Sequence, residues 1–321
     1  MRVAASLLVT LCVLGAGACG GSSHSTATTT TVARPKVAVA TVPGSTPTGD
    51  LAFLGPVRTA PVDGITVAFR QFGAGPPVLL IVGQDSPIGL WGSDLPRRLA
   101  AHHRVTMFDN RGIGASTDQA GRPLTIQLMG DDTAALIAAL ALDHPTIVGW
   151  STGGEIALAM AVDHPGVAGP MVLSGATAGG PTAVQTPAAV QDQLGTRPLD
   201  FLFPAAAASA RAAYQADVAR VPIENMTAAI FQREDEAEAR FVASTVTYDG
   251  LPRIRDRIVV VNGAQDQLVP PENARIIAGR IPGAILRIVP DAAHALMFQD
   301  PAWFTSVVDA ASAGRAIPPV P

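Results

Sequence analysis

The chain has 321 residues, of which 48% are hydrophobic and 15% are charged, and its formal net charge is −4. This composition is typical of a globular protein with a large core, and the slightly acidic charge provides no positive field that would attract nucleic acid. Lys36 is the only lysine in the sequence, and it lies in an N-terminal segment that is expected to stay unfolded. A Schiff-base lysine, a Ser-Lys dyad and a P-loop are therefore excluded from the folded part.

The N-terminus has the pattern of an export signal. A positively charged start precedes a short apolar run over residues 3–14, and small residues follow as far as Cys19. The run is too short for a comfortable transmembrane span. The residues before Cys19 resemble a bacterial lipobox, with Ala16 where leucine is usual. This resemblance implies that residues 1–18 are a signal peptide and that Cys19 carries a lipid such as palmitate. Secretion without a lipid is the alternative.

The segment after Cys19 is predicted to be a flexible tether. Residues 19–50 are rich in Ser, Thr, Gly and Pro and have too little apolar content to fold. A tether of this kind would lift the folded domain off the outer face of the cell membrane. Cys12 and Cys19 are the two cysteines, so a lipidated mature chain has no free thiol for a nucleophile, a disulfide or a thiolate metal site. Residues 315–321 are predicted to be a second flexible end.

From residue 51 onward, short apolar runs alternate with helical patterns. The runs are typical of strands buried on both faces of a parallel sheet. They occupy residues 78–82, 105–108, 146–148, 171–173, 258–261 and 285–289, after a predicted hairpin at 57–60 and 62–70. Helical patterns occupy residues 126–142, 155–162 and 271–281. This alternation predicts a doubly wound α/β core formed by residues 51–178 and 252–314.

Residues 179–251 interrupt the alternation between two predicted strands. They contain helix-like stretches and no strand-like run. An insert of this length is too long for a simple loop, so we expect a helical cap over the edge of the sheet. We expect the cap to be alanine-rich and weakly charged, which favours a substrate with a modest apolar acyl or alcohol group.

A serine lies at the junction between an apolar run and a helical pattern. Residues 149–154 read GWSTGG, so Ser151 fits the G-x-S-x-G pattern between a strand and a helix. A serine on such a sharp turn needs small neighbours, and the following helix directs unpaired N–H groups toward its hydroxyl. The pattern predicts that Ser151 is a nucleophile. A glycine-rich packing turn is the structural alternative.

A serine nucleophile needs a histidine base and an orienting carboxylate. His294 is the one histidine in a loop directly after the last predicted strand, so we predict that it is the base. Asp266 follows the strand at residues 258–261 and is the predicted acid, with Asp291 as a rival that more simply shapes its own turn. His102 and His103 have no third ligand nearby in sequence and no H-E-x-x-H occurs, so neither a metal nor any other cofactor is expected.

These motifs resemble the α/β-hydrolase superfamily from about residue 57 to residue 308. The matching segments are GWSTGG, NGAQDQLVP around Asp266, PDAAHALMFQDP around His294, and FDNRGIGAS at residues 108–116. The resemblance implies that Asp109 and Arg111 brace a loop. It also implies an oxyanion hole formed by the backbone N–H groups of Gln84 and Thr152.

The oxyanion loop departs from the family pattern. Residues 82–85 read VGQD, where the family commonly has His-Gly. The different side chains leave the backbone N–H donors in place. The side chain of Asp85 would oppose a developing negative charge if it points inward.

The leading hypothesis is a serine hydrolase that cleaves a small, apolar carboxylic ester through an acyl-enzyme at Ser151. A perhydrolase or a carbon–carbon bond hydrolase would use the same triad and stays open. A surface-anchored binding protein that keeps the pocket without turnover is the alternative from another class. Trp91 and Trp150 are candidates for lining the pocket, and core packing explains each of them equally well.

Overall fold

The computed structural model describes residues 37–321 except residue 195 and residues 223–226. The predicted signal peptide and the predicted lipidation at Cys19 lie outside the described residues. Among the residues that are described, no helix is both long enough and apolar enough to cross a membrane.

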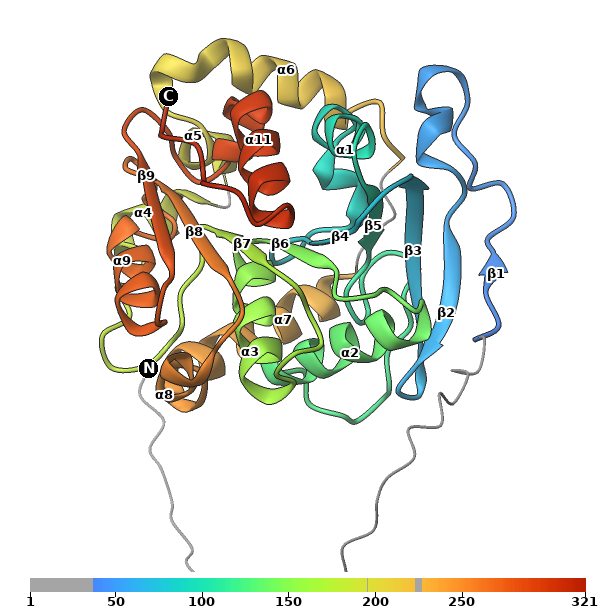
Figure 1. Ribbon diagram of the computed structural model, residues 1–321, viewed down its shortest axis with the longest axis horizontal. Helices are drawn as coiled ribbons and strands as arrows, with labels where there is room; N and C mark the ends of the chain where they lie inside the picture. The colour runs from blue at the N-terminus through green and yellow to red at the C-terminus, as the bar shows by residue number, and fades with distance from the viewer. Residues whose placement is uncertain (1–36, 195, 223–226) are drawn as a thin grey trace, which may run out of the picture. The chain divides into compact units, whose positions relative to one another are not determined.

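A nine-stranded sheet forms the centre of the described chain (Figure 1). Its spatial order is β1-β2-β3-β5-β4-β6-β7-β8-β9. The strands are β1 (Ala40–Thr41), β2 (Arg58–Val62), β3 (Ile65–Gly73), β4 (Pro77–Ile81), β5 (Arg104–Phe108), β6 (Thr146–Trp150), β7 (Met171–Ser174), β8 (Ile258–Gly263) and β9 (Ile285–Val289). The pairs β1-β2, β2-β3 and β3-β5 are antiparallel, and all pairs from β5 to β9 are parallel.

The strands β6, β7 and β8 are buried along their whole length. Helices cover both faces of the sheet, so these strands need apolar side chains pointing both ways, and their mostly apolar sequences follow from this requirement. The predicted strand positions and the mostly parallel α/β-hydrolase fold are confirmed.

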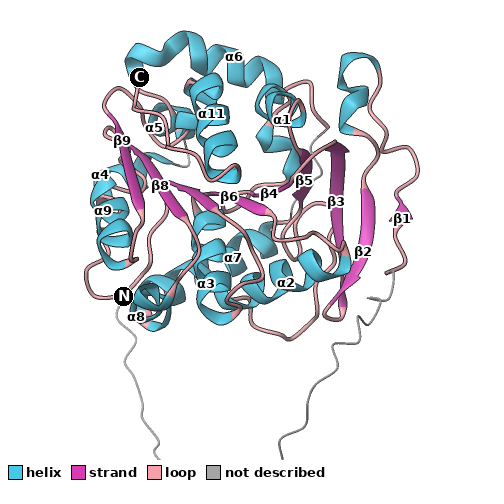
Figure 2. Cartoon of the chain, in the orientation of Figure 1, coloured by secondary structure: helices cyan, strands magenta, loops and turns pink. Residues whose placement is uncertain are grey.

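Helices lie on both sides of the sheet (Figure 2). On one side α2 (Ile126–Ala139), α3 (Thr152–Asp163) and α9 (Pro271–Arg280) share one apolar cluster. On the other side α1 (Asp94–Ala100) packs against α11 (Pro301–Ser312), and both contribute to a second cluster. The short helix α10 (Leu296–Gln299) joins the loop after β9 to α11. The two clusters hold the sheet from both faces and so fix the ends of its parallel strands.

The insert between β7 and β8 is helical. It contains α4 (Ala188–Leu194), α5 (Pro198–Leu202), α6 (Ala208–Val218), α7 (Ala228–Ala243) and α8 (Val246–Gly250). Short 3-10 helices lie at Gly49–Leu54, Ile88–Trp91, Ala205–Ala207 and Leu251–Arg253. The expectation that this cap is weakly charged fails for α7, whose sequence AAIFQREDEAEARFVA contains four carboxylates.

Parts of both segments that were predicted to be flexible make contacts with the folded core. The tether was expected to run to residue 50, but β1 pairs with β2 and the Ser45 hydroxyl accepts a hydrogen bond from the Val57 N–H at 2.9 Å. At the C-terminus, Arg287 donates to the carbonyl of Ile317 at 2.9 Å, and the Ile317 side chain is buried. Backbone pairing, side-chain hydrogen bonds and the buried Ile317 side chain hold these segments against the sheet.

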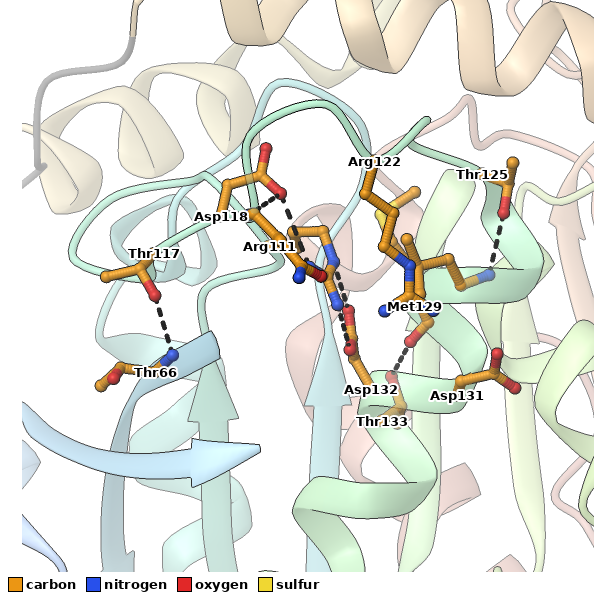
Figure 3. Close-up of polar contacts among 12 residues, drawn as sticks. Thr66, Arg111, Thr117, Asp118, Arg122, Thr125, Met129, Asp131, Asp132 and Thr133 are labelled. Atoms are coloured by element: carbon orange, nitrogen blue, oxygen red, sulfur yellow. Dashed lines mark hydrogen bonds and ion pairs between the residues drawn. The ribbon is translucent and has the colours of Figure 1, made fainter. Parts of the chain in front are cut away.

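The loop after β5 is braced by a buried ion pair (Figure 3). Arg111 donates two hydrogen bonds to Asp132 of α2, at 2.8 and 2.6 Å, and its third nitrogen lies 3.5 Å from Asp118. Asp109 Oδ1 accepts from the Ile88 N–H at 2.8 Å. Burial raises the pKa of the Asp132 carboxyl, and the adjacent guanidinium opposes that shift. These contacts are those of a structural brace that holds the loop against α2 and against the segment after β4.

Candidate active site

Ser151 occupies a strained corner between β6 and α3. Its φ and ψ are 56° and −128°, a region that non-glycine residues rarely adopt and that costs roughly 1–3 kcal/mol. Its N–H is held by the Ser174 carbonyl of the neighbouring strand at 2.8 Å. The sheet and helix layer therefore fix the backbone that presents the Ser151 hydroxyl.

The glycines around Ser151 are required by close packing. A Cβ at Gly149 would lie 2.6 Å from the Gly153 carbonyl oxygen, and a Cβ at Gly153 would lie 2.1 Å from the carbonyl oxygen of Ile81. On the opposite side, a Cβ at Gly83 would lie 3.0 Å from the Ser151 Cβ. Close packing therefore explains the glycines of the G-x-S-x-G pattern. It does not explain why a serine occupies the strained position between them.

His294 and Asp266 form a buried pair. His294 Nδ1 lies 2.8 Å from Asp266 Oδ2, and the two residues are 4% and 3% exposed. The other Asp266 oxygen accepts from the N–H groups of Leu268 and Val269 at 3.0 and 2.9 Å. With Asp266 as the acceptor, Nδ1 carries the proton and Nε2 is left with a lone pair. The rival Asp291 is exposed.

Trp150 and Gly175 hold the His294 ring in place. The Trp150 indole N–H donates to the His294 carbonyl at 3.1 Å, and the two rings lie 5.8 Å apart. A Cβ at Gly175 would lie 2.8 Å from the His294 ring, so only glycine leaves room for it. Trp91 is fully buried against Trp150, with ring centroids 6.0 Å apart, and belongs to the core.

Ser151 and His294 line the same cavity, which has a volume of about 650 Å³. We call it the Ser151 cavity. No hydrogen bond between Ser151 Oγ and the His294 ring occurs among the described residues. Catalytic hydrogen bonds in unliganded sites are often long and tighten only with substrate. Apolar side chains from both cap and core form much of the remaining wall: Leu90, Leu199, Leu202, Val218, Leu268 and Val269.

The expected oxyanion donors lie next to Ser151. Gln84 follows β4 and lines the Ser151 cavity, and Thr152 is the first residue of α3. Neither backbone N–H donates a hydrogen bond within the described part of the chain. A helix N-terminus leaves such groups unpaired and favours negative charge beside them. An oxyanion hole requires two free N–H donors near the nucleophile, and these two groups are candidates for that role.

The cap helix α7 contacts Gln84, Asp85 and Thr152 through three carboxylates. Glu234 accepts from the Asp85 N–H at 2.6 Å, and Asp235 accepts from the Gln84 side chain at 2.6 Å. Glu238 accepts from the Thr152 hydroxyl at 3.1 Å and lines the Ser151 cavity. The sequence analysis missed these three residues; the dense acidic run in α7 was the signal available.

Burial disfavours ionisation throughout this carboxylate group. It raises the pKa of Glu234 to about 8 and that of Asp85 to about 6. Burial also raises the pKa of Glu238, and of Glu155 on α3, with repulsion between these two adding to the shift in Glu155. Within the described residues, none of the four is in an ion pair with arginine. Asp85 lines the cavity, and its raised pKa means that it carries a negative charge there only above about pH 6.

The remaining histidines of the described chain lie away from the Ser151 cavity. His102 and His103 both contact Asp309 of α11, at 3.0 and 2.7 Å, and thereby tie the start of β5 to that helix. His164 contacts Asp131 at 2.7 Å. No group of three potential metal ligands occurs among the described residues.

Comparison with known proteins agrees with this architecture. The chain is 27% identical over 270 residues to "Putative carbamate hydrolase RutD" of Caulobacter sp. strain K31, an alignment that covers 78% of this chain and 97% of that protein. It is 26% identical over 260 residues to 2-hydroxymuconate semialdehyde hydrolase of Pseudomonas sp. strain CF600, covering 76% and 89%.

A solved structure has the same fold. The esterase RhEst1 of Rhodococcus sp. ECU1013 superposes with a TM-score of 0.67 at 22% identity, covering 81% of this chain and 99% of that one. Residues 73–301 match the family described as the alpha/beta hydrolase fold. On this match, together with its sheet order and helical insert, the chain belongs to the α/β-hydrolase family.

Proposed function

We propose that this protein is a serine hydrolase that cleaves carboxylic esters, with Ser151 as the nucleophile, His294 as the base and Asp266 as the orienting acid. The observation that carries the proposal is the buried Asp266–His294 pair, which faces the same cavity as the strained Ser151. A histidine held in this tautomer and a serine fixed by its backbone are the two parts that acyl transfer needs.

The chemistry follows from these positions. His294 Nε2 takes the hydroxyl proton of Ser151 as Oγ attacks the ester carbonyl carbon. The resulting oxyanion accepts hydrogen bonds from the N–H groups of Gln84 and Thr152. His294 then gives its proton to the leaving alcohol, and an acyl-enzyme remains. Water attacks this acyl group with His294 again as base, which releases the acid and restores Ser151.

The lining of the Ser151 cavity supports a neutral substrate with an apolar group. Leucine and valine side chains of the cap would bury a hydrocarbon chain, at about 0.8 kcal/mol per methylene. Above about pH 6, where Asp85 is ionised, an anionic substrate would meet a negative charge in the same cavity. The charge of the lining therefore favours neutral esters over acids and their salts.

The test is hydrolysis of p-nitrophenyl esters of increasing acyl length. We expect turnover by the wild type and a loss of about 10⁴-fold or more in kcat for Ser151→Ala and for His294→Ala. Asp266→Asn keeps the shape of the acid and is expected to cost a similar factor through the histidine tautomer. Equal activity of Ser151→Ala and the wild type would contradict the proposal.

A second candidate is cleavage of another acyl bond by the same triad. The names of the two relatives, a carbamate hydrolase and a semialdehyde hydrolase, support a carbamate or a carbon–carbon bond as the scissile group. A perhydrolase uses the same residues with peroxide in place of water. Parallel assays with a carbamate, a vinylogous diketone and hydrogen peroxide, each against Ser151→Ala, separate these reactions from ester hydrolysis.

The remaining alternative is that the protein binds an ester without hydrolysing it. Its support is the altered oxyanion loop and the carboxylates above it. In that case an ester would bind to the wild type and to Ser151→Ala with equal affinity, and no hydrolysis product would form.

For location, we propose export and anchoring on the outer face of the cell membrane through a lipid on Cys19. The support is the sequence pattern of residues 1–19 alone. Radiolabelled palmitate should enter the full-length chain and not the Cys19→Ala variant. A Cys19→Ala variant that stays with the membrane fraction, or a wild type released into the medium, would favour the alternatives.

A further inference from the structure

A second cavity lies behind the wall of the Ser151 cavity. It has a volume of about 380 Å³. Residues from α1, α6 and the start of α11 line it, together with Asp50, Arg220 and Phe298. Of all the described residues that line either cavity, Tyr214 alone lines both. Its side chain is therefore the partition between the two spaces.

Tyr214 is held firmly in this position. It projects from α6 of the cap and is 9% exposed. Its ring stacks on Phe298 with centroids 4.5 Å apart, and its hydroxyl donates to the Leu90 carbonyl at 3.0 Å. Burial raises the pKa of the Tyr214 hydroxyl, which keeps it a neutral donor. The ring is thus fixed from one side by the cap and from the other by the core.

A line of packed aromatic rings joins this partition to the nucleophile. Trp150, the residue before Ser151, lies 5.2 Å from Phe298 by ring centroids, and Phe298 stacks on Tyr214. Leu90 and Val218 line the Ser151 cavity on the same side as Tyr214, since Leu90 accepts its hydroxyl and Val218 lies one helical turn along α6. An apolar chain attached at Ser151 would follow these side chains and end at the Tyr214 ring.

We propose that Tyr214 sets the greatest length of the apolar chain that this enzyme accepts, and that the second cavity is a space beyond its ring that the chain reaches only when the ring is removed. The proposal rests on the hydrolase function given above. Its substrate class is neutral esters whose acyl or alcohol chain ends at the Tyr214 ring, with longer chains excluded by contact with that ring. Tyr214 acts on selectivity and takes no part in proton transfer.

The experiment is the dependence of kcat/KM on acyl length for Tyr214→Ala, Tyr214→Leu, Tyr214→Phe and the wild type. Each buried methylene is worth about fourfold in kcat/KM until the chain meets a wall. In Tyr214→Ala the maximum should move by about two carbons or more, and the first excluded ester should gain about tenfold. Tyr214→Leu should give a smaller shift in the same direction, which provides a test if the alanine variant does not fold.

Two variants identify the cause of such a shift. Tyr214→Phe keeps the ring and loses only the hydrogen bond to Leu90, so the length limit should stay where it is in the wild type. Ala210 lines the second cavity and not the Ser151 cavity. Adding Ala210→Phe to Tyr214→Ala should refill the second cavity and restore the shorter limit. A limit that is unchanged in folded Tyr214→Ala, or one that shifts equally in Tyr214→Phe, overturns the proposal.

A binding measurement separates this proposal from the hydrolase function. Calorimetry with a long-chain p-nitrophenyl ester compares Ser151→Ala with Ser151→Ala/Tyr214→Ala, where no turnover is needed. Tighter binding of the long ester by the double variant supports the role of Tyr214 even if no ester is hydrolysed by the wild type. Equal affinities, or no binding by either variant, overturn the role of Tyr214 even if the wild type is an esterase.

Discussion

Glu238 of the cap accepts a hydrogen bond from the Thr152 hydroxyl at 3.1 Å, which places a carboxylate beside the residue that follows the proposed nucleophile. An oxyanion hole stabilises negative charge, so an ionised Glu238 would work against it. Burial raises the pKa of Glu238, and the protonated form removes this conflict. The cap therefore links the charge of the site to pH.

Replacing Glu238 with glutamine should raise activity at alkaline pH. Glu238→Gln keeps the hydrogen bond to Thr152 and removes a charge that opposes the oxyanion by roughly 1 kcal/mol at several ångströms. We expect kcat/KM for a neutral ester to rise several-fold at alkaline pH, where Glu238 is ionised in the wild type, and to change less at acidic pH. Stopped-flow pH profiles provide the measurement.

The matched control for Glu238→Gln is Glu236→Gln. Glu236 lies on the same helix but is exposed and paired with Arg240 at 2.8 Å. Its pH profile should follow that of the wild type. If both variants change the alkaline rate equally, the effect comes from the net charge of the cap and not from the position of Glu238.

Glu234 should make the fold less stable as pH rises. Burial raises its pKa from 4.5 to about 8 in the folded chain, so the protonated carboxyl is the form that the fold favours. Its contribution is fully present below pH 4.5 and is lost as pH rises toward 8. Burial also raises the pKa of Asp85, from 3.8 to about 6, so its contribution to stability is lost in the same direction over a lower pH range.

Scanning calorimetry between pH 5 and pH 9 tests this. The Tm of the wild type should fall with pH, and in Glu234→Gln the fall should be smaller by about 2 °C or more. Glu272→Gln changes an exposed carboxylate at the start of α9 and should leave the slope unchanged. A Glu234→Gln variant with the same slope as the wild type would show that Glu234 titrates alike in the folded and unfolded chain.

Arg111→Ala should destabilise the fold by about 3–5 kcal/mol, because it leaves the buried Asp132 carboxylate without its partner. Arg98→Ala breaks an exposed pair with Asp94 and should cost less than about 0.5 kcal/mol. Urea unfolding monitored by circular dichroism compares the two. Losses of equal size would show that the pair at Arg111 is not a brace.

Gly153 and Gly279 should respond to alanine with opposite signs. A Cβ at Gly153 would press on the Ile81 backbone at 2.1 Å, so Gly153→Ala should unfold the chain or distort the Ser151 corner. Gly279 lies in α9 with open space around it, and Gly279→Ala should stabilise by about 0.5–1 kcal/mol. Thermal unfolding of both variants is the measurement, and a tolerated Gly153→Ala would contradict the close approach of helix and sheet.

The sequence predicts the core of this site because each motif follows its own apolar strand. Ser151 comes directly after β6, Asp266 lies just past β8 and His294 just past β9, so a parallel sheet brings their loops to one edge. Along the chain the order is Ser151, Asp266 and then His294, which is the order of the α/β-hydrolase motifs. Asp266 and His294 lie 2.8 Å apart in the structure.

The sequence predicts a helical cap but does not predict which residues of the core the cap contacts. Glu234, Asp235 and Glu238 resemble a solvated acidic helix face in sequence, and only the placement of α7 turns them toward Gln84, Asp85 and Thr152. Tyr214 likewise has no local signal, because its role comes from two cavities whose walls are formed by distant segments. The pairing of β1 depends on contacts with residues 57–59 that composition does not show.

The most direct test of the central claim is covalent labelling by a fluorophosphonate, followed by peptide mass spectrometry. A serine activated by His294 and Asp266 should form one adduct, located on Ser151, and labelling should be lost in Ser151→Ala and strongly slowed in His294→Ala. A wild type that stays unlabelled while folded, or an adduct on a different residue, would contradict the account.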